Sequence, residues 1–121
     1  MIIGLGIDII GIERVRAAIE RHPRFLLRVY TEAERTAIAQ KGAQTAAGYF
    51  AAKEAVAKAL GTGFRGFGMS DIGIATDDLG APRAALTNGA LERLVLMGGK
   101  GVFVSITHDK DTAAAIAVIE S

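Results

Sequence analysis

The chain has 121 residues, a formal net charge of +1 and a composition in which half of the residues are hydrophobic, which fits one domain spanning residues 1–121. The near-neutral charge argues against a nucleic-acid-binding protein, because such proteins concentrate basic residues on one surface. The sequence has no cysteine, which excludes disulfides and thiolate chemistry and fits a cytoplasmic protein, and it has neither a signal peptide pattern nor the ~18-residue apolar run of a membrane span.

The N-terminal third predicts a strand followed by two helices. Residues 1–10 are rich in Ile and Leu and punctuated by glycine, which favours a short buried strand. Apolar residues then recur at helical spacing from residue 12 to about residue 23. Thr31-Glu32-Ala33-Glu34 has the pattern of a capping box, which predicts a short helix that continues to about residue 40.

An alanine-rich segment from about residue 45 to residue 60 predicts the longest helix, which ends at Gly61, a residue type that terminates helices. Residues 61–68 contain four glycines in eight positions and predict a mobile loop. The glycine spacing is not that of a Walker loop, and the glycines follow a helix instead of preceding one, so a flap is the better interpretation than a phosphate cradle.

The C-terminal half predicts four strands and one helix. Residues 70–76 and 82–86 alternate like a hairpin around the turn at residues 77–80. A helix that begins at Thr87 or Asn88 and two last strands, residues 102–107 and 113–119, follow. The order β-α-α-α-β-β-α-β-β predicts an α+β domain, in which a long central helix packs against a mainly antiparallel sheet.

Asp8 interrupts an apolar strand, where an unpaired carboxylate has a large desolvation cost. It either caps the helix that follows or lies beside a cation at the end of the strand. Glu54 and Lys58 are spaced to share one helical face with Ala47 and Ala51, either as an ordinary surface ion pair or as part of a site that a ligand approaches closely. Lys53 falls within an apolar stripe, so we expect this helix to be covered on more than one side.

His108 ends an apolar strand and follows Ser105-Ile106-Thr107, so it is either structural or a substrate contact. Strand alternation places Ser105 and His108 on opposite faces, which argues against a catalytic triad. Two carboxylates, two lysines and a flap suit a hard cation that is bound to a diphosphate. Magnesium takes one or two protein carboxylates and completes its shell with substrate oxygens and water.

Four segments, in this order, resemble the holo-acyl-carrier-protein synthase family of small 4′-phosphopantetheinyl transferases: GLGIDIIGIERV, RFLLRVYTEAE, YFAAKEAVAKALGTG and SITHDKDTAAAIAVIE. The resemblance covers nearly the whole chain. It implies the 4′-phosphopantetheinyl transferase fold and transfer of phosphopantetheine from coenzyme A to a serine of apo-acyl carrier protein. The products are holo-acyl carrier protein, which serves fatty acid biosynthesis, and adenosine 3′,5′-bisphosphate. It also implies a homotrimer with active sites between neighbouring subunits.

The resemblance assigns roles to residues of this chain. Asp8 and Glu54 match the Mg²⁺ ligands, and Lys58 matches the lysine near the phosphates, so these three form the catalytic group. The predicted coenzyme A contacts are Lys58, Gly61, Gly63, Pro82 and His108, with Pro82 beside the nucleotide. The resemblance also implies that a basic first helix binds the acidic face of acyl carrier protein, and Arg14, Arg24 and Arg28 are the candidates for this surface. Either Glu54 or a water accepts the proton of the attacking serine, and a water is preferred because Glu54 is already a metal ligand.

One position departs from the family pattern. Tyr49 stands where many members have a basic residue directly before the F-A-A-K-E-A element, and Arg65 in the glycine-rich loop is a candidate to compensate. The rival hypothesis is a non-catalytic module that binds carrier proteins. The presence of Asp8, Glu54 and Lys58 argues against this rival.

Overall fold

The computed structural model describes the whole chain, residues 1–121. The strands are β1 (Ile2–Gly11), β2 (Ile72–Thr76), β3 (Pro82–Leu86), β4 (Gly101–His108) and β5 (Thr112–Glu120). The helices are α1 (Ile12–Arg21), α2 (Phe25–Val29), α3 (Glu32–Lys41), α4 (Ala43–Ala59) and α5 (Asn88–Leu96). The α+β class and the predicted order are confirmed, and the structure adds the one-turn helix α2 and a 3₁₀ turn, η1 (Met69–Asp71).

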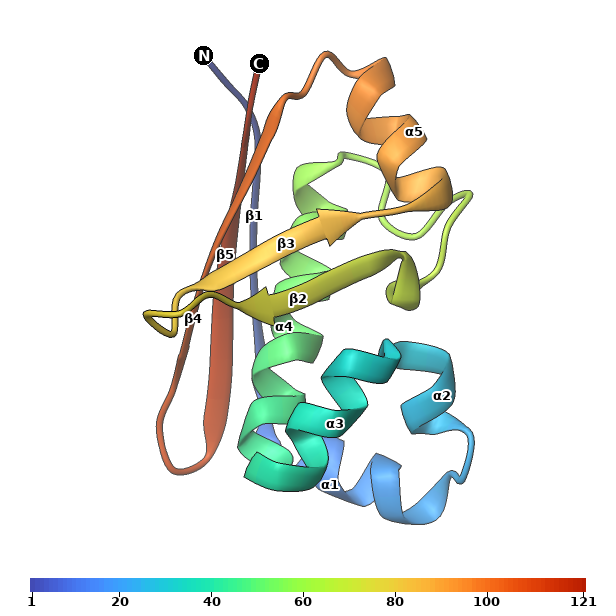
Figure 1. The fold of residues 1–121 in the computed structure, drawn as a ribbon, viewed down its shortest axis with the longest axis vertical. Helices are drawn as coiled ribbons and strands as arrows, with labels where there is room; N and C mark the ends of the chain where they lie inside the picture. The colour runs from blue at the N-terminus through green and yellow to red at the C-terminus, as the bar shows by residue number, and fades with distance from the viewer.

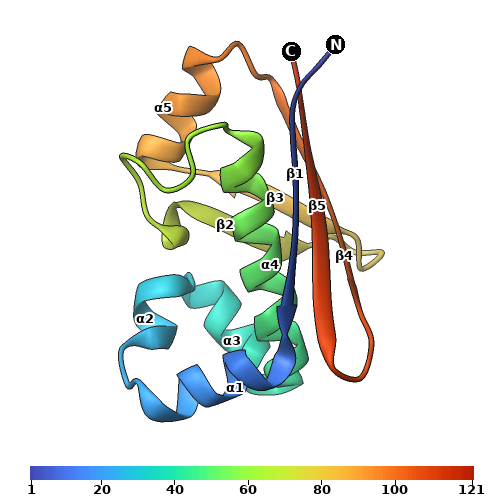
Figure 2. The ribbon, with the colours of Figure 1, turned by 180° about the vertical axis from the view of Figure 1, so that it is seen from behind.

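The strands form two antiparallel sheets. The larger has the order β1-β5-β4, and β2 pairs with β3 as a separate hairpin. The two termini lie side by side at one end of the molecule, where Ser121 N–H donates to the Met1 carbonyl at 2.9 Å (Figure 1). In Figure 2 all the helices lie on one side of the larger sheet, so its other face has no covering layer.

Helix α4 packs directly on β1 and β5 because small residues line the contact. A methyl group added at Gly6 would collide with the Ala55 carbonyl, and one added at Gly4 would collide with the Ala59 carbonyl. On β5 the residues turned toward the helix are alanines and one isoleucine: Ala113, Ala115, Ala117 and Ile119 are all buried. The core therefore has few large side chains, as the low aromatic content predicts.

Helix α3 begins with the predicted capping box. The Glu34 N–H donates to Thr31 Oγ1 at 3.2 Å, and the Thr31 N–H donates back to Glu34 Oε1 at 2.8 Å. Glu34 also forms an ion pair with Lys53 of α4 at 2.8 Å, and both side chains are fully buried. Burial lowers the pKa of Lys53 and the Glu34 carboxylate opposes this shift. Lys53 is thus covered, as its place in the apolar stripe predicts.

The uncovered face of the larger sheet is apolar except for Ser105 and Thr107 on β4. Three cross-strand rows cross β1, β5 and β4 on this face: Leu5–Val118–Phe103, Ile7–Ile116–Ser105 and Ile9–Ala114–Thr107. Ile7 is 66% exposed and Phe103 is 49% exposed.

None of the helices is both long and apolar enough to span a bilayer.

Candidate functional site

Asp8, Glu54 and Lys58 meet where β1 passes α4. Asp8 lies on the face of β1 that is turned toward α4, in the same row as the glycines that admit the helix. The Lys58 ammonium lies 3.2 Å from Asp8 Oδ1 and donates to the Ile7 carbonyl at 2.9 Å. The Asp8 side chain is only 18% exposed, whereas that of Lys58 is 53% exposed. The lysine therefore reaches the carboxylate from the solvent side.

Glu54 is half-buried, and its surroundings disfavour its negative charge. Burial raises the pKa of Glu54, the Asp8 carboxylate raises it further, and Lys58 acts in the opposite direction. Two carboxylates that repel each other in a partly buried position are stabilised by a cation between them. Lys58 supplies part of this charge.

The structure also tests the simpler interpretations of these residues. Helix α1 has Gly11 at its N-cap and no side-chain capping bond, so Asp8 does not cap it. Lys58 forms its ion pair with Asp8 on the neighbouring strand, and not with Glu54 one turn away. The arrangement is therefore a tertiary cluster and not a helix-surface pair.

The donor set fits a hard divalent cation. No group of three or more His, Cys, Asp or Glu side chains is arranged to hold a metal, so a bound ion would have at most two protein carboxylates. That number is the usual one for Mg²⁺, which binds substrate phosphates and water at its other positions. Asp8 and Glu54 have the required chemistry, and their mutual repulsion provides a reason to bind a cation.

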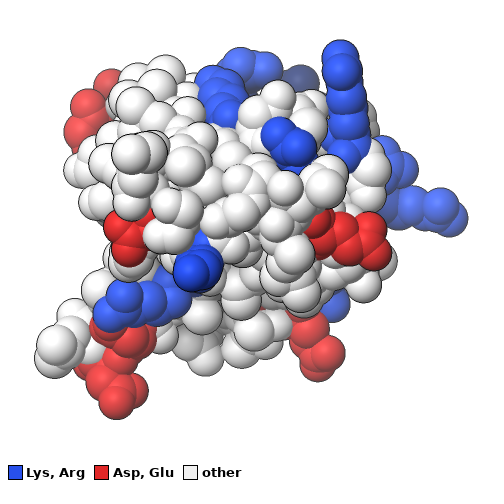
Figure 3. Space-filling model, turned by 90° about the horizontal axis from the view of Figure 1, so that it is seen from above, with Lys and Arg blue, Asp and Glu red and all other residues white.

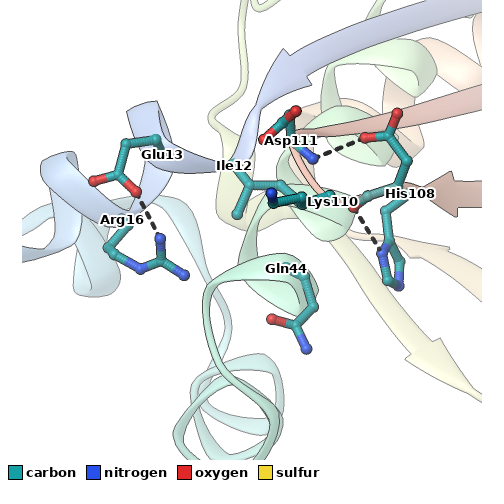
Figure 4. Close-up of a pocket in the computed structure, with 8 residues that line it drawn as sticks. Ile12, Glu13, Arg16, Gln44, His108, Lys110 and Asp111 are labelled. Carbon is teal, nitrogen blue, oxygen red and sulfur yellow. Dashed lines mark hydrogen bonds and ion pairs between the residues drawn. The ribbon is translucent and has the colours of Figure 1, made fainter.

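His108 and Pro82 lie together in a different place. A pocket of about 270 Å³ is lined by both of these residues together with Lys41, Tyr49 and Thr76. His108 and Gln44 also line an adjoining pocket of about 410 Å³ between α1, the N-terminal end of α4 and the β4–β5 hairpin. Figure 4 shows Glu13 and Arg16 paired on one side of this second pocket, and His108 on the other.

These two groups do not converge within one chain. Asp8 lies on β1 and His108 on β4, which are the two edges of the larger sheet. Two inter-strand spacings separate the edges by roughly 10 Å, and α4 lies over the strand between them. The structure therefore brings Asp8, Glu54 and Lys58 together and brings Pro82 and His108 together, as two separate sites.

The glycine-rich loop leaves α4 directly after Lys58. Gly61 and Gly63 have positive φ values of 81° and 61°, so the backbone conformation favours glycine at both positions. The Arg93 guanidinium of α5 donates to the Leu60 carbonyl at 2.8 Å and fixes the point where the loop begins. The loop contains no helix or strand, as the sequence predicts.

The basic residues of the first helices are exposed. Arg24 and Arg28 line a pocket of about 550 Å³ with His22, Pro23 and Phe25 at the corner between α1 and α2. Arg14 is exposed on α1. Seen from the end of the molecule that carries the termini, much of the surface is uncharged, and basic side chains lie both within this face and at its edges (Figure 3).

Sequence reasoning missed the residues that accompany Pro82 and His108. Lys41 ends α3 directly before the start of α4, and Gln44 is in the first turn of α4. Their position at a helix junction was the available signal, because helix N-termini attract anions. Tyr49 lines the same pocket, and burial raises its pKa, so it presents a neutral phenol there.

We predict opposite shifts of the Glu54 pKa in two variants. Asp8→Asn removes a repelling charge and lowers the pKa of Glu54, whereas Lys58→Met removes the opposing cation and raises it further. The measurement is an NMR titration of the Glu54 side-chain carboxyl in metal-free protein. Shifts of the same sign in both variants would contradict the proposed cluster, and Lys100→Met is the control that leaves this pKa unchanged.

Comparison with known proteins agrees with this architecture. Residues 4–117 match the model of the 4′-phosphopantetheinyl transferase superfamily. The chain is 44% identical to the holo-[acyl-carrier-protein] synthase of Clostridium tetani, over 99% of this chain and 97% of that protein. The crystal structure of the Neisseria meningitidis enzyme superposes with a TM-score of 0.90 at 36% identity and covers both chains completely.

A second solved structure contains a ligand. The Helicobacter pylori holo-[acyl-carrier-protein] synthase, in complex with coenzyme A, has a TM-score of 0.85 and 31% identity, covering 96% of this chain and 99% of that one. The match thus holds for sequence and fold over almost the full length of both proteins. The chain belongs to the 4′-phosphopantetheinyl transferase superfamily.

Proposed function

We propose that this chain performs the holo-acyl-carrier-protein synthase reaction with Mg²⁺ held by Asp8 and Glu54. The reaction moves 4′-phosphopantetheine from coenzyme A to a serine hydroxyl of apo-acyl carrier protein and supports fatty acid biosynthesis. The observation that carries the proposal is the meeting of Asp8, Glu54 and Lys58 beside β1. Residues 1–121 then form one catalytic domain, which acts in the cytoplasm.

The chemistry is an in-line displacement at phosphorus. The serine oxygen forms a bond to the phosphate next to the pantetheine arm, and the bond from that phosphorus to the bridging oxygen breaks, which releases adenosine 3′,5′-bisphosphate. When bound, Mg²⁺ neutralises diphosphate charge. The Lys58 ammonium offsets negative charge that develops on the leaving phosphate. The serine proton passes to water, which is preferred over Glu54 because Glu54 would already be a metal ligand.

The direct test replaces each carboxylate by its amide. Asp8→Asn and Glu54→Gln keep the shape of the side chain but remove a ligand charge, and we expect transfer to fall by at least about 100-fold, the scale of losing one electrostatic contact to the transition state. The assay weighs apo-carrier after incubation with coenzyme A and Mg²⁺. Circular dichroism checks that both variants remain folded.

The control variant is Glu92→Gln, which removes an exposed carboxylate from α5 and should leave transfer unchanged. A fully active Glu54→Gln would exclude the metal assignment. If the unmodified protein binds carrier but adds no mass to it, the non-catalytic binding module is the correct function instead.

The proposal includes a homotrimer with active sites between subunits. Two observations support such an assembly. The bare face of the larger sheet carries exposed Leu5, Ile7 and Ile9, a continuous apolar surface of the kind that forms interfaces. The Asp8 and His108 groups lie at opposite edges of that sheet, so the two groups of neighbouring subunits can meet across an interface when those of one chain do not.

We expect Ile7→Lys to dissociate the assembly, because it places a charge in the middle row of the bare face. Sedimentation velocity measures the mass, and the transfer assay measures activity, which should fall with the mass. Leu91→Lys is the matched control, since Leu91 is an exposed apolar residue on α5, away from this sheet. A variant that is monomeric and fully active would contradict shared active sites.

The acidic carrier protein is proposed to dock on α1 and α2. Arg14, Arg24 and Arg28 are exposed there, and the pocket beside Arg24 and Arg28 also contains Phe25, so the surface offers positive charge around an aromatic contact. Charge of one sign raises the rate at which an oppositely charged partner associates. The proposed coenzyme A contacts lie on other elements, namely α4, the loop that follows it, β3 and β4, so the two substrates can be separated by mutation.

We predict that Arg24→Glu raises the KM for apo-carrier by about 10-fold or more, within the range of electrostatic steering, and leaves the KM for coenzyme A unchanged. The effect should shrink as salt concentration rises, because exposed charges are screened. Lys100→Glu, an equal charge reversal elsewhere on the surface, is the control. Equal effects of the two reversals would argue against this docking surface.

A further inference from the structure

Lys53 precedes Glu54 in the sequence but points to the other side of α4. Its ammonium donates to the Met69 carbonyl at 3.0 Å and to the Ile72 carbonyl at 2.6 Å, and it pairs with Glu34 at 2.8 Å. An ammonium has three N–H donors, so these contacts use all of them. No N–H of Lys53 is available for a substrate, so Lys53 acts through the protein groups that it binds.

Met69 directly follows the glycine-rich loop, residues 61–68, and Ile72 begins β2 three residues later. The same stretch is fixed by Asp71, whose carboxylate accepts from the Gly68 N–H at 3.0 Å and from the Asn88 side chain at 2.8 Å. Glu34 completes the network by accepting from the Ile74 N–H at 2.6 Å. The C-terminal end of the loop is therefore held to α4 at the level of Lys53.

The N-terminal end of the loop is held to the same helix near Lys58. The Gly61 N–H donates to the Lys58 carbonyl at 3.0 Å, and Arg93 bonds the Leu60 carbonyl. The two ends thus flank the helical segment that carries Glu54 and Lys58. Figure 1 shows the loop leaving the end of α4, passing beside α5 and returning to β2.

Between these ends the glycine-rich backbone of the loop has little intrinsic preference for one shape. Gly61, Gly63 and Gly66 all have positive φ, and a methyl group added at Gly63 would have no heavy atom within 4 Å. Glycine backbones have more accessible conformations than others, so the position of such a loop depends on its attachments. The Phe64 and Phe67 rings of the loop pair edge-to-face and pack against the core, and the Gly66 carbonyl lies so close to Gly89 of α5 that a methyl group there would collide with it.

We propose that Lys53, together with Asp71, is a positioning residue that holds the glycine-rich loop in register with Glu54 and Lys58, so that the loop covers the diphosphate of coenzyme A. This inference rests on the proposed function, because it requires a diphosphate in that place. It gives the buried Lys53–Glu34 pair a role beyond stability. Buried ion pairs can often be replaced by apolar or neutral residues without loss of stability, so stability alone does not require the pair.

The test uses the double variant Glu34→Gln/Lys53→Met. Lys53→Met alone leaves an unpaired buried carboxylate and is expected to lower the melting temperature strongly, whereas the double variant removes both charges and should recover most of it. It still lacks the bonds to Met69 and Ile72. We expect its KM for coenzyme A to rise about 10-fold, equivalent to losing roughly 1.4 kcal/mol, while its KM for apo-carrier stays unchanged.

A second readout needs neither substrate nor metal. Arg65 is exposed in the loop, so trypsin cleavage after Arg65, followed by mass spectrometry, reports how firmly the loop is held. Cleavage there should be several-fold faster in the double variant, relative to cleavage after exposed Lys110 in the same sample. A double variant with recovered stability, unchanged cleavage and unchanged KM for coenzyme A would overturn the inference.

Asp71→Ser provides an independent variant if the double variant does not fold. It leaves the buried pair intact and removes only the bonds to Gly68 and Asn88 at the surface, and it should show the same faster cleavage and the same rise in KM for coenzyme A. Unchanged values would again overturn the inference. A wild-type protein that does not modify carrier would refute the proposed function, whereas an active wild type with unaltered variants would refute this inference alone.

Discussion

The site depends on a close contact between β1 and α4, in which two glycines of the strand face the backbone of the helix. Gly4 and Gly6 face the Ala59 and Ala55 carbonyls so closely that neither position accepts a methyl group without a shift. Two residues advance a strand by roughly 6.8 Å and four residues advance a helix by roughly 6 Å, so small residues at these intervals keep the two elements aligned. Asp8 is the next residue in this row, and its carboxylate is brought beside the helix that carries Glu54 and Lys58.

The same close contact fixes the rotation of α4 about its axis. Consecutive helical residues point about 100° apart, so a helix that turns Glu54 toward β1 must turn Lys53 toward β2. Lys53 is buried against the β2 backbone and Glu34, where its charge has a full set of partners. A rotation that moved Glu54 away from Asp8 would therefore also separate the Lys53 ammonium from its partners, so the orientation of the proposed catalytic face is strongly preferred.

Much of this architecture was predictable because it is encoded locally. Hydrophobic periodicity located the strands and long helices, the capping box placed the start of α3, and Gly61 marked the end of α4. Asp8 was recognisable as a candidate because an unpaired carboxylate in an apolar strand has a large desolvation cost. Helix α2 was missed since five residues are too few to show a period. The partner of Lys58 could not be found from spacing, because Asp8 lies 50 residues away in sequence.

The separation of the two groups of site residues follows from strand order, which the sequence pattern does not reveal. Residues near the ends of β1 and β4 look equally suited to one site until β5 is placed between them. Strand alternation gives β1 two functions at once: Asp8 faces the helix, while Ile7 and Ile9 face away on the bare apolar surface. In the proposed trimer, Ile7 and Ile9 are buried at the interface, and they are the immediate neighbours of Asp8, the proposed metal ligand. Assembly and active-site geometry then become coupled through a single strand.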